Sequence, residues 1–96
     1  MKVARSAERH IRDAAAWWAE NRTEVPRLFA EDLETALDLI EQFPYAGEAV
    51  RHRTGPLRRV LLSRVNYHLY YSVNVEARIV KVVALWHTSR GSKPRM

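Results

Sequence analysis

Residues 28–44 read LFAEDLETALDLIEQFP and carry the clearest periodicity in the chain. Apolar residues recur there every three or four positions, namely Phe29, Leu33, Ala36, Leu37, Ile40 and Phe43, with Leu28 and Leu39 beside them. Acidic residues occupy the opposite face, namely Glu31, Glu34, Asp38 and Glu41. This spacing predicts a long amphipathic helix with one buried stripe. Pro44 ends it, because the residue before a proline disfavours the helical conformation.

The preceding segment predicts a second helix. Its apolar residues also recur at helical spacing, and they are Ala7, Ile11, Ala14, Ala15 and Trp18. Ser6 is the expected N-cap, and Glu8 lies in the first turn, where it meets the positive end of the helix dipole. This helix should end near Asn21.

A short connection joins the two predicted helices. Thr23 is the expected cap of the second helix, and Pro26 suits a first helical turn because its missing N–H does no harm there. The short connection Arg22–Val25 therefore predicts an antiparallel helical hairpin.

Past Pro44 the period changes from helical to alternating. Tyr45–Pro56 contains two glycines and a proline and is expected to be a loop. Leu57–Ser63 and Arg78–Trp86 are apolar runs that predict strands. Tyr67–Val73 places Tyr67, Leu69, Tyr71 and Val73 on one face and His68, Tyr70 and Ser72 on the other. The turn Asn74–Ala77 joins two of these strands into a hairpin.

The ends of the chain complete the predicted fold. Met1–Arg5 is either an edge strand or a frayed end, and His87–Met96 is a basic tail containing Gly91 and Pro94. The pattern predicts an α+β fold, with an antiparallel helical hairpin packed on a small, mainly antiparallel sheet. A length of 96 residues predicts a single domain, 1–96, with one hydrophobic core.

Composition excludes several classes of protein. There is no cysteine, which excludes a disulfide scaffold, a thiolate zinc site, an iron–sulfur cluster and a cysteine nucleophile. The four histidines do not pair at metal-ligand spacing, and the common phosphate-loop and hydrolase motifs are absent. We expect no metal and no cofactor. No apolar run approaches a membrane span and no signal peptide is evident, so a cytoplasmic protein without a membrane partner is expected.

Charge is divided unequally along the chain. Residues 1–48 hold 6 Lys or Arg against 10 Asp or Glu, a net charge of −4. Residues 49–96 hold 10 Lys or Arg against one acid, Glu76, a net charge of +9. A basic half of this kind attracts a polyanion such as nucleic acid or an acidic protein segment, or it only keeps the protein soluble.

Three groups of residues are candidates for function. The first is basic, and its members are Arg51, His52, Arg53, Arg58, Arg59 and Arg64. Arginine forks bind phosphate or carboxylate, although adjacent Arg58 and Arg59 point to opposite faces of a strand. The alternative is that these charges are merely solvated at a sheet edge.

The second group is aromatic, comprising Tyr67, His68, Tyr70 and Tyr71, and either stacks on unpaired bases or belongs to the core. The third is the strand end with His87 and Arg90. A histidine and an arginine there could act as general base and transition-state clamp in RNA cleavage, which uses the substrate's own 2′-OH. The alternative is an ordinary polar strand end.

Short motifs follow one another in a fixed order along nearly the whole chain. They are Ala7-Glu8, Ile11 and Trp17-Trp18; Phe29, Leu33, Ala36-Leu37, Ile40, Phe43-Pro44 and Gly47; Gly55 and Leu57-Arg58-Arg59; Tyr67-His68-Leu69-Tyr70-Tyr71; and Ile79, Val83, Leu85-Trp86-His87 and Arg90. In this order they resemble the ParE/RelE superfamily of bacterial type II toxins, the plasmid stabilisation proteins. The resemblance implies an N-terminal strand, a helical hairpin and three antiparallel strands.

The resemblance also implies partners and two possible targets. Such a toxin is neutralised by an antitoxin segment that folds on it, so a toxin–antitoxin hetero-oligomer is expected. ParE-like members poison DNA gyrase, whereas RelE-like members cleave mRNA on the ribosome. Thr88 stands where a late catalytic tyrosine would follow His87, and no lysine lies between Lys2 and Lys81. These departures favour the ParE branch.

The first hypothesis is therefore a gyrase poison that acts by contact and is not an enzyme. Its expected antitoxin- or target-contact residues are Arg51, Arg53, Arg58, Arg59, Arg64, His87 and Arg90. The alternative is a metal-independent, ribosome-dependent endoribonuclease with Arg59, His87 and Arg90 as catalytic residues.

Overall fold

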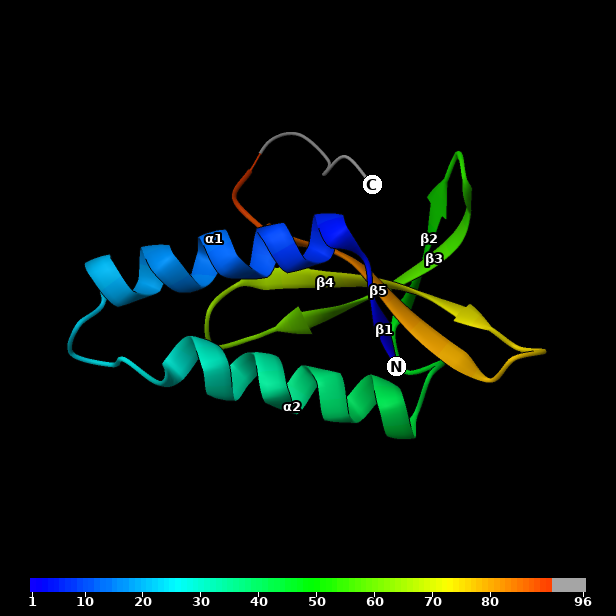
Figure 1. The fold of residues 1–96 in the computed structure, drawn as a ribbon, viewed down its shortest axis with the longest axis horizontal. Helices are drawn as coiled ribbons and strands as arrows, with labels where there is room; N and C mark the ends of the chain where they lie inside the picture. Colours follow the sequence, from blue (N-terminus) through cyan, green and yellow to red (C-terminus); the bar gives the residue numbers. More distant parts are fainter. Residues whose placement is uncertain (91–96) are drawn as a thin grey trace.

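Two helices pack on a five-stranded sheet (Figure 1). The computed structural model describes residues 1–90, so Gly91 and Pro94 of the predicted tail lie outside the described residues. The elements in chain order are β1 (Lys2–Val3), α1 (Arg5–Asn21), α2 (Leu28–Gln42), β2 (Glu48–His52), β3 (Gly55–Leu62), β4 (Tyr67–Asn74) and β5 (Ile79–His87). This arrangement confirms the predicted α+β fold class.

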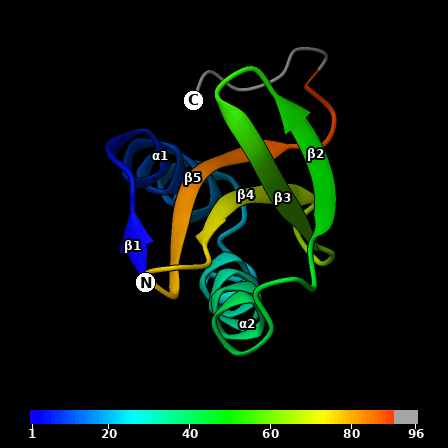
Figure 2. The same ribbon diagram turned by 90° about the vertical axis from the view of Figure 1, so that its right-hand side faces the viewer.

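The sheet has the strand order β1-β5-β4-β3-β2. β1 runs parallel to β5, and every other neighbouring pair is antiparallel. At the centre, Leu69 of β4 pairs with Val60 on one side and with Leu85 on the other. The register of β4 on β5 shifts between Tyr70 and Tyr71. Figure 2 shows a strongly twisted sheet with β1 at one edge and β2 at the other.

Helix α1 does not begin as the sequence predicted. Ala4 is the N-cap and makes no side-chain capping bond, whereas the Oγ of Ser6 donates to the carbonyl of Val83 at 2.7 Å. The prediction of Ser6 as N-cap was wrong because β1 leads directly into the helix. The Ala4 N–H is already bonded to the carbonyl of Val82, so the sheet sets the helix start. The helix ends at Asn21, as predicted.

The connection between the helices is longer than predicted. Residues 22–27 form successive turns, with the Val25 N–H bonded to Arg22 and the Leu28 N–H bonded to Val25. Thr23 is therefore not a cap, and Pro26 lies in a turn and not in the helix. Helix α2 ends at Gln42, just before Phe43 and Pro44. In the described residues 1–90, neither helix is long and apolar enough to cross a membrane.

The prediction of a loop over Tyr45–Pro56 was wrong in its second half. Glu48–His52 forms β2, which pairs with β3 from Glu48↔Arg59 to His52↔Gly55. β2 is an edge strand with few apolar residues, so its local sequence carries little β signal, and pairing with β3 decides its conformation. Gly55 has φ 134°, a conformation that suits glycine and allows the tight turn between the two strands.

The core lies between the helices and one face of the sheet. Its fully buried side chains include Ile40 of α2, Leu69 and Tyr71 of β4, and Val82 of β5. Tyr67 and Val73 pack against this cluster, which confirms the predicted alternation of β4. Phe43, expected in the helical stripe, is 62% exposed because α2 has already ended.

Candidate functional site

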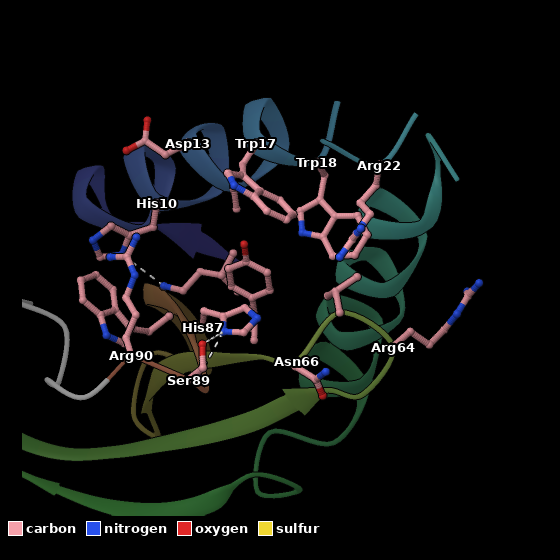
Figure 3. A pocket seen from close by; sticks show the side chains of 15 residues that line it. His10, Asp13, Trp17, Trp18, Arg22, Arg64, Asn66, His87, Ser89 and Arg90 are labelled. Atoms are coloured by element: carbon pink, nitrogen blue, oxygen red, sulfur yellow. Dashed lines mark hydrogen bonds between the residues drawn. The ribbon is translucent and has the colours of Figure 1, made fainter. Parts of the chain in front are cut away.

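A cleft opens between α1, the turn that joins β3 to β4, and the end of β5 (Figure 3). Its volume is about 570 Å³. The lining side chains come from three places. They are Trp17 and Trp18 of α1 with Arg22, the residue that caps it; Arg64 and Asn66 of the turn; and His87, at the end of β5, with Arg90 just beyond it. Three segments that are distant in sequence thus bring basic and aromatic groups together.

The floor of the cleft is fixed by hydrogen bonds to the backbone. Asp32 of α2, 8% exposed, accepts the N–H groups of Arg64 and Val65 at 2.8 and 3.1 Å. Asn66 has φ 61°, which asparagine tolerates better than most residues, and its carbonyl accepts the Thr88 N–H at 2.9 Å. The turn and the end of β5 are therefore held together, and α2 holds the turn.

His10 of α1 forms part of the wall. Its Nδ1 accepts the backbone N–H of Leu85 at 3.2 Å, and its ring meets Trp86 edge-on, with 5.3 Å between centroids. Burial lowers the pKa of His10 from its ordinary value, and the charges of Arg9 and Arg90 lower it further. A neutral ring suits the site, because Nδ1 accepts a hydrogen bond only when it carries no proton.

His87 is oriented by the residues that follow it. Its Nδ1 accepts the Ser89 N–H at 3.1 Å and lies 2.7 Å from the Ser89 hydroxyl. In the neutral ring with an accepting Nδ1, the hydrogen resides on Nε2, which is then a donor. The ring also packs edge-on against Tyr67, with 5.0 Å between centroids.

Guanidinium groups lie over the indole rings of the cleft. The Arg22 guanidinium carbon lies 5.8 Å from the Trp17 centroid and 5.9 Å from that of Trp18. That of Arg90 lies 4.4 Å from the Trp86 centroid. These are cation–π distances. The Nε1 of Trp18 is buried and has no hydrogen-bond partner within the described part of the chain.

Arg58 and Arg59 lie on opposite faces of β3, as the alternation predicted. Arg58 donates to the carbonyls of Gly47 at 2.6 Å and Tyr45 at 3.2 Å, so it holds the segment before β2. Arg59 pairs with Glu48 at 2.6 Å. A hydrogen bond to Tyr70 and the pairing with Glu48 raise the pKa of Arg59.

The predicted contact residues fall into two groups. Arg51, Arg53, Arg58 and Arg59 belong to the β2–β3 hairpin, whereas Arg64, His87 and Arg90 line the cleft. Of the three catalytic candidates, His87 and Arg90 are brought together and Arg59 is not. Among residues 1–90, no group of three or more His, Cys, Asp or Glu side chains could hold a metal ion.

Sequence analysis did not identify His10, Asp13, Arg22 or Asn66 as site residues. Arg22 follows Trp18 by four residues at the end of α1, a spacing that brings side chains of one helix face together and could have indicated that pair. The others meet only through the fold, since His10 and Leu85 are 75 residues apart in sequence.

Comparison with known families identifies the chain. The family model described as ParE toxin of type II toxin-antitoxin system, parDE, matches residues 1–91. The chain belongs to the ParE toxin family. Membership confirms the resemblance to ParE/RelE-superfamily toxins that the ordered motifs indicated. A search of curated proteins found no match.

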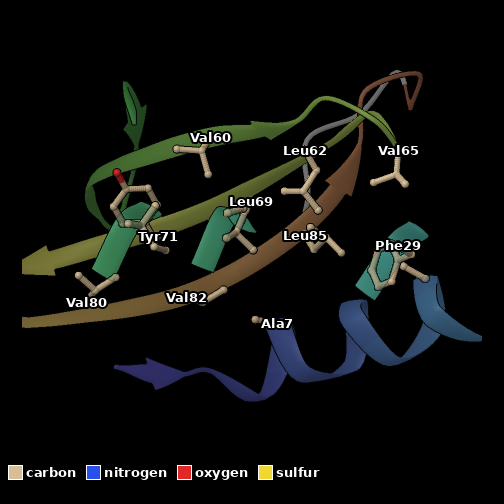
Figure 4. Close-up of a cluster of buried hydrophobic side chains, with 13 residues drawn as sticks. Ala7, Phe29, Val60, Leu62, Val65, Leu69, Tyr71, Val80, Val82 and Leu85 are labelled. Atoms are coloured by element: carbon tan, nitrogen blue, oxygen red, sulfur yellow. The ribbon is translucent and has the colours of Figure 1, made fainter. Parts of the chain in front are cut away.

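Two of the motifs of this ParE family member meet at Tyr71, which lies in the buried cluster of Figure 4. The hydroxyl of Tyr71, fully buried in β4, donates to the carbonyl of Pro44 at 2.7 Å and accepts the Gly47 N–H at 2.9 Å. A Cβ on Gly47 would lie 2.5 Å from that hydroxyl, so only glycine fits. Burial raises the pKa of Tyr71. The Phe-Pro-x-x-Gly segment and the tyrosine strand therefore form one structural unit.

Proposed function

We propose that this ParE family toxin inhibits growth by poisoning DNA gyrase and is neutralised by a cognate antitoxin. The observation that carries the proposal is the family match over residues 1–91. The geometry supports a contact mechanism as well. RNA cleavage requires a base, an acid and charge stabilisation in one place. Arg59 is paired with Glu48 on the β2–β3 hairpin and does not line the cleft with His87 and Arg90.

A ribosome-dependent endoribonuclease is the second candidate function. One observation favours it: His87 and Arg90 line the same cleft. A histidine protonates a leaving oxygen when both of its ring nitrogens carry a proton, and an arginine can stabilise negative charge that develops on phosphate.

Two assays distinguish these functions. The purified chain is added to a gyrase supercoiling reaction, and separately to a translating extract whose mRNA ends are mapped. We expect loss of supercoiling or trapped cleaved DNA in the first assay, and no codon-positioned cuts in the second. Cuts that disappear with His87→Ala, together with normal supercoiling, would establish the ribonuclease and exclude the gyrase proposal.

The antitoxin is the second part of the proposal. We place its acidic segment on the basic region around Arg51–Arg64, because electrostatic attraction directs association to the surface of highest opposite charge. Arg51 is exposed on β2 and Arg53 is exposed in the turn that follows. These two arginines test the footprint better than Arg58, whose bonds to Gly47 and Tyr45 hold the fold.

A further inference from the structure

The cleft carries a buried hydrogen-bond donor that no described residue satisfies. The Nε1–H of Trp18 is buried and has no acceptor in residues 1–90. Native proteins satisfy most buried donors, because an unsatisfied one is costly. Figure 3 shows the Trp18 and His87 rings on facing sides of the cleft. Since the Nδ1 of His87 accepts the Ser89 N–H, its Nε2 is a donor as well.

The charges around the cleft favour an anion. Arg22, Arg64 and Arg90 line it, against a single carboxylate, that of Asp13. Arg22 and Arg90 lie over indole rings, and the Arg64 contact with Glu31 is long, at 3.7 Å, between exposed side chains. The three arginines against one carboxylate leave an excess of two positive charges among the Arg and Asp side chains of the lining, which matches a phosphate monoester near pH 7.

The walls of the cleft favour a flat aromatic group attached to that anion. All three tryptophans of the chain line the cleft, and Trp17 is 47% exposed. Exposed indoles and guanidinium planes are the surfaces on which nucleic-acid bases stack. A volume of about 570 Å³ lies within the usual range for small-molecule sites.

We propose that this cleft is a nucleotide-binding site. The phosphate is bound by Arg22 and the donors of Trp18 and His87, and the base stacks on the exposed indole of Trp17. Arg90 adds positive charge from the opposite side of the cleft. Arg22 covers part of the Trp18 ring and has to shift when the phosphate pairs with the Trp18 N–H. The ligand chemistry is a phosphate monoester on a nucleoside, which either a free nucleotide or the 5′-phosphorylated end of a strand can supply.

The test is a calorimetric titration of the full chain with AMP, adenosine, inorganic phosphate and a 5′-phosphorylated dinucleotide. We expect AMP to bind about tenfold more tightly than adenosine or phosphate alone, because each lacks one half of the contacts. Tighter binding of AMP than of the dinucleotide assigns the site to free nucleotides, and the reverse order assigns it to strand ends. Equal binding of AMP and adenosine, or no binding of AMP, would overturn the proposal.

Variants locate the binding. Trp18→Phe keeps an aromatic ring at this position and removes the indole N–H, and Arg22→Gln removes the positive charge. Each should weaken AMP binding by about fivefold to tenfold. Arg51→Gln on the hairpin is the control and should leave binding unchanged. The circular dichroism spectrum verifies that each variant is folded. A folded Trp18→Phe and a folded Arg22→Gln that both bind AMP like the unaltered chain would place the nucleotide elsewhere and contradict the assignment, as would an acidic peptide that competes with AMP at equal affinity.

Discussion

Asp32 is a buried carboxylate on the helix face that packs against the sheet, and both of its contacts are backbone N–H groups. Those bonds fix the turn that presents Arg64 and Asn66 to the cleft. Charged acceptors paired with backbone donors are stronger than neutral pairs, and removing one leaves the donors unsatisfied. One residue of α2 therefore determines the shape of a site to which it contributes no side chain.

Asp32→Ala should lower the free energy of unfolding by about 1–3 kcal/mol. The reason is that the N–H groups of Arg64 and Val65 lose their acceptor while Val65 stays buried. Urea unfolding followed by circular dichroism measures the change. Glu34→Ala, at an exposed position of the same helix, is the matched control. Equal stability of the two variants would show that the turn does not depend on Asp32.

Tyr71→Phe should be destabilising by about 1–3 kcal/mol. Phenylalanine fills the same space, so the loss arises from the Pro44 carbonyl and the Gly47 N–H, which lose their shared partner. The measurement is again urea unfolding. Tyr45→Phe serves as control, since Tyr45 is 57% exposed. A Tyr71→Phe chain as stable as the unaltered one would mean that these two groups find other partners.

His10 and His68 make stability depend on pH. Burial is the main cause that lowers both pKa values, with Arg9 and Arg90 adding to it at His10 and Arg59 at His68. In the unfolded chain the histidine pKa is about 6.5. The histidines of the unfolded chain therefore bind protons at a higher pH than those of the folded chain. Their contribution to stability is complete above about pH 6.5 and is lost as the pH falls from there through the lowered pKa values.

We expect the free energy of unfolding to be smaller at about pH 5 than at about pH 7.5. His10→Gln should reduce that difference, because glutamine does not titrate. His52→Gln is the control and should leave the difference unchanged, because among residues 1–90 the His52 ring bonds to Thr54 alone, in the turn between β2 and β3. A pH dependence that His10→Gln does not alter would show that the bond to Leu85 is not coupled to protonation.

At the scale of elements, the sequence predicted the helices and strands whose own residues show a clear helical or alternating hydrophobic pattern. The stripe from Phe29 to Ile40 and the alternation of β4 are local patterns, and both matched the structure. β2 was missed because its conformation depends on pairing with β3 and not on its own residues. The cap at Ser6 was wrong for a similar reason, since Ser6 bonds to Val83 of a strand far along the chain.

The site was less predictable than the fold. His87 and Arg90 stood out because a histidine and an arginine end a strand, whereas Arg22 and Asn66 become neighbours of that strand end only after the chain has folded. Arg59 was grouped with them by residue type, and its pairing with Glu48 depends on the register of the unpredicted β2. Register is a tertiary property that no local pattern specifies.

The elements should also differ in local stability. β4 lies between two neighbours and contains Leu69 and Tyr71, both fully buried, whereas β2 is an edge strand bonded to β3 alone. Local opening of β2 breaks fewer contacts. Hydrogen exchange followed by NMR should show β2 amides exchanging at least about 100-fold faster than those of β4. Similar rates in both strands would indicate that the sheet opens only as a whole.

At the scale of the whole molecule, charge follows the order of the chain. Residues 1–48, which include both helices, have a net charge of −4, and residues 49–96, which include β3, β4 and β5, have +9. The structure divides the predicted contact residues between the hairpin and the cleft. The two proposals therefore place the antitoxin on the hairpin and the nucleotide in the cleft.

The double variant Arg51→Glu/Arg53→Glu should slow antitoxin association and flatten its dependence on salt, because it removes charge that steers the encounter. Stopped-flow mixing with the purified cognate antitoxin, at several ionic strengths, measures both. Arg5→Glu/Arg12→Glu on α1 makes the same change in net charge elsewhere. If that control slows association equally, overall charge and not the hairpin is responsible.

The contacts of Ser6 and His10 with the backbone of β5 determine at which edge a further strand can be added to this sheet. Past the two residues of β1, Ser6 is hydrogen-bonded to the carbonyl of Val83 and His10 to the N–H of Leu85. These backbone groups would otherwise be free to pair with another strand. Within residues 1–90, β2 is therefore the longer template for a strand donated by a second polypeptide. The exposed charge of Arg51 on β2 discourages edge-to-edge pairing of copies of the chain. On the other side of the sheet, Ser6 and His10 of α1 oppose the pairing of another copy along β5.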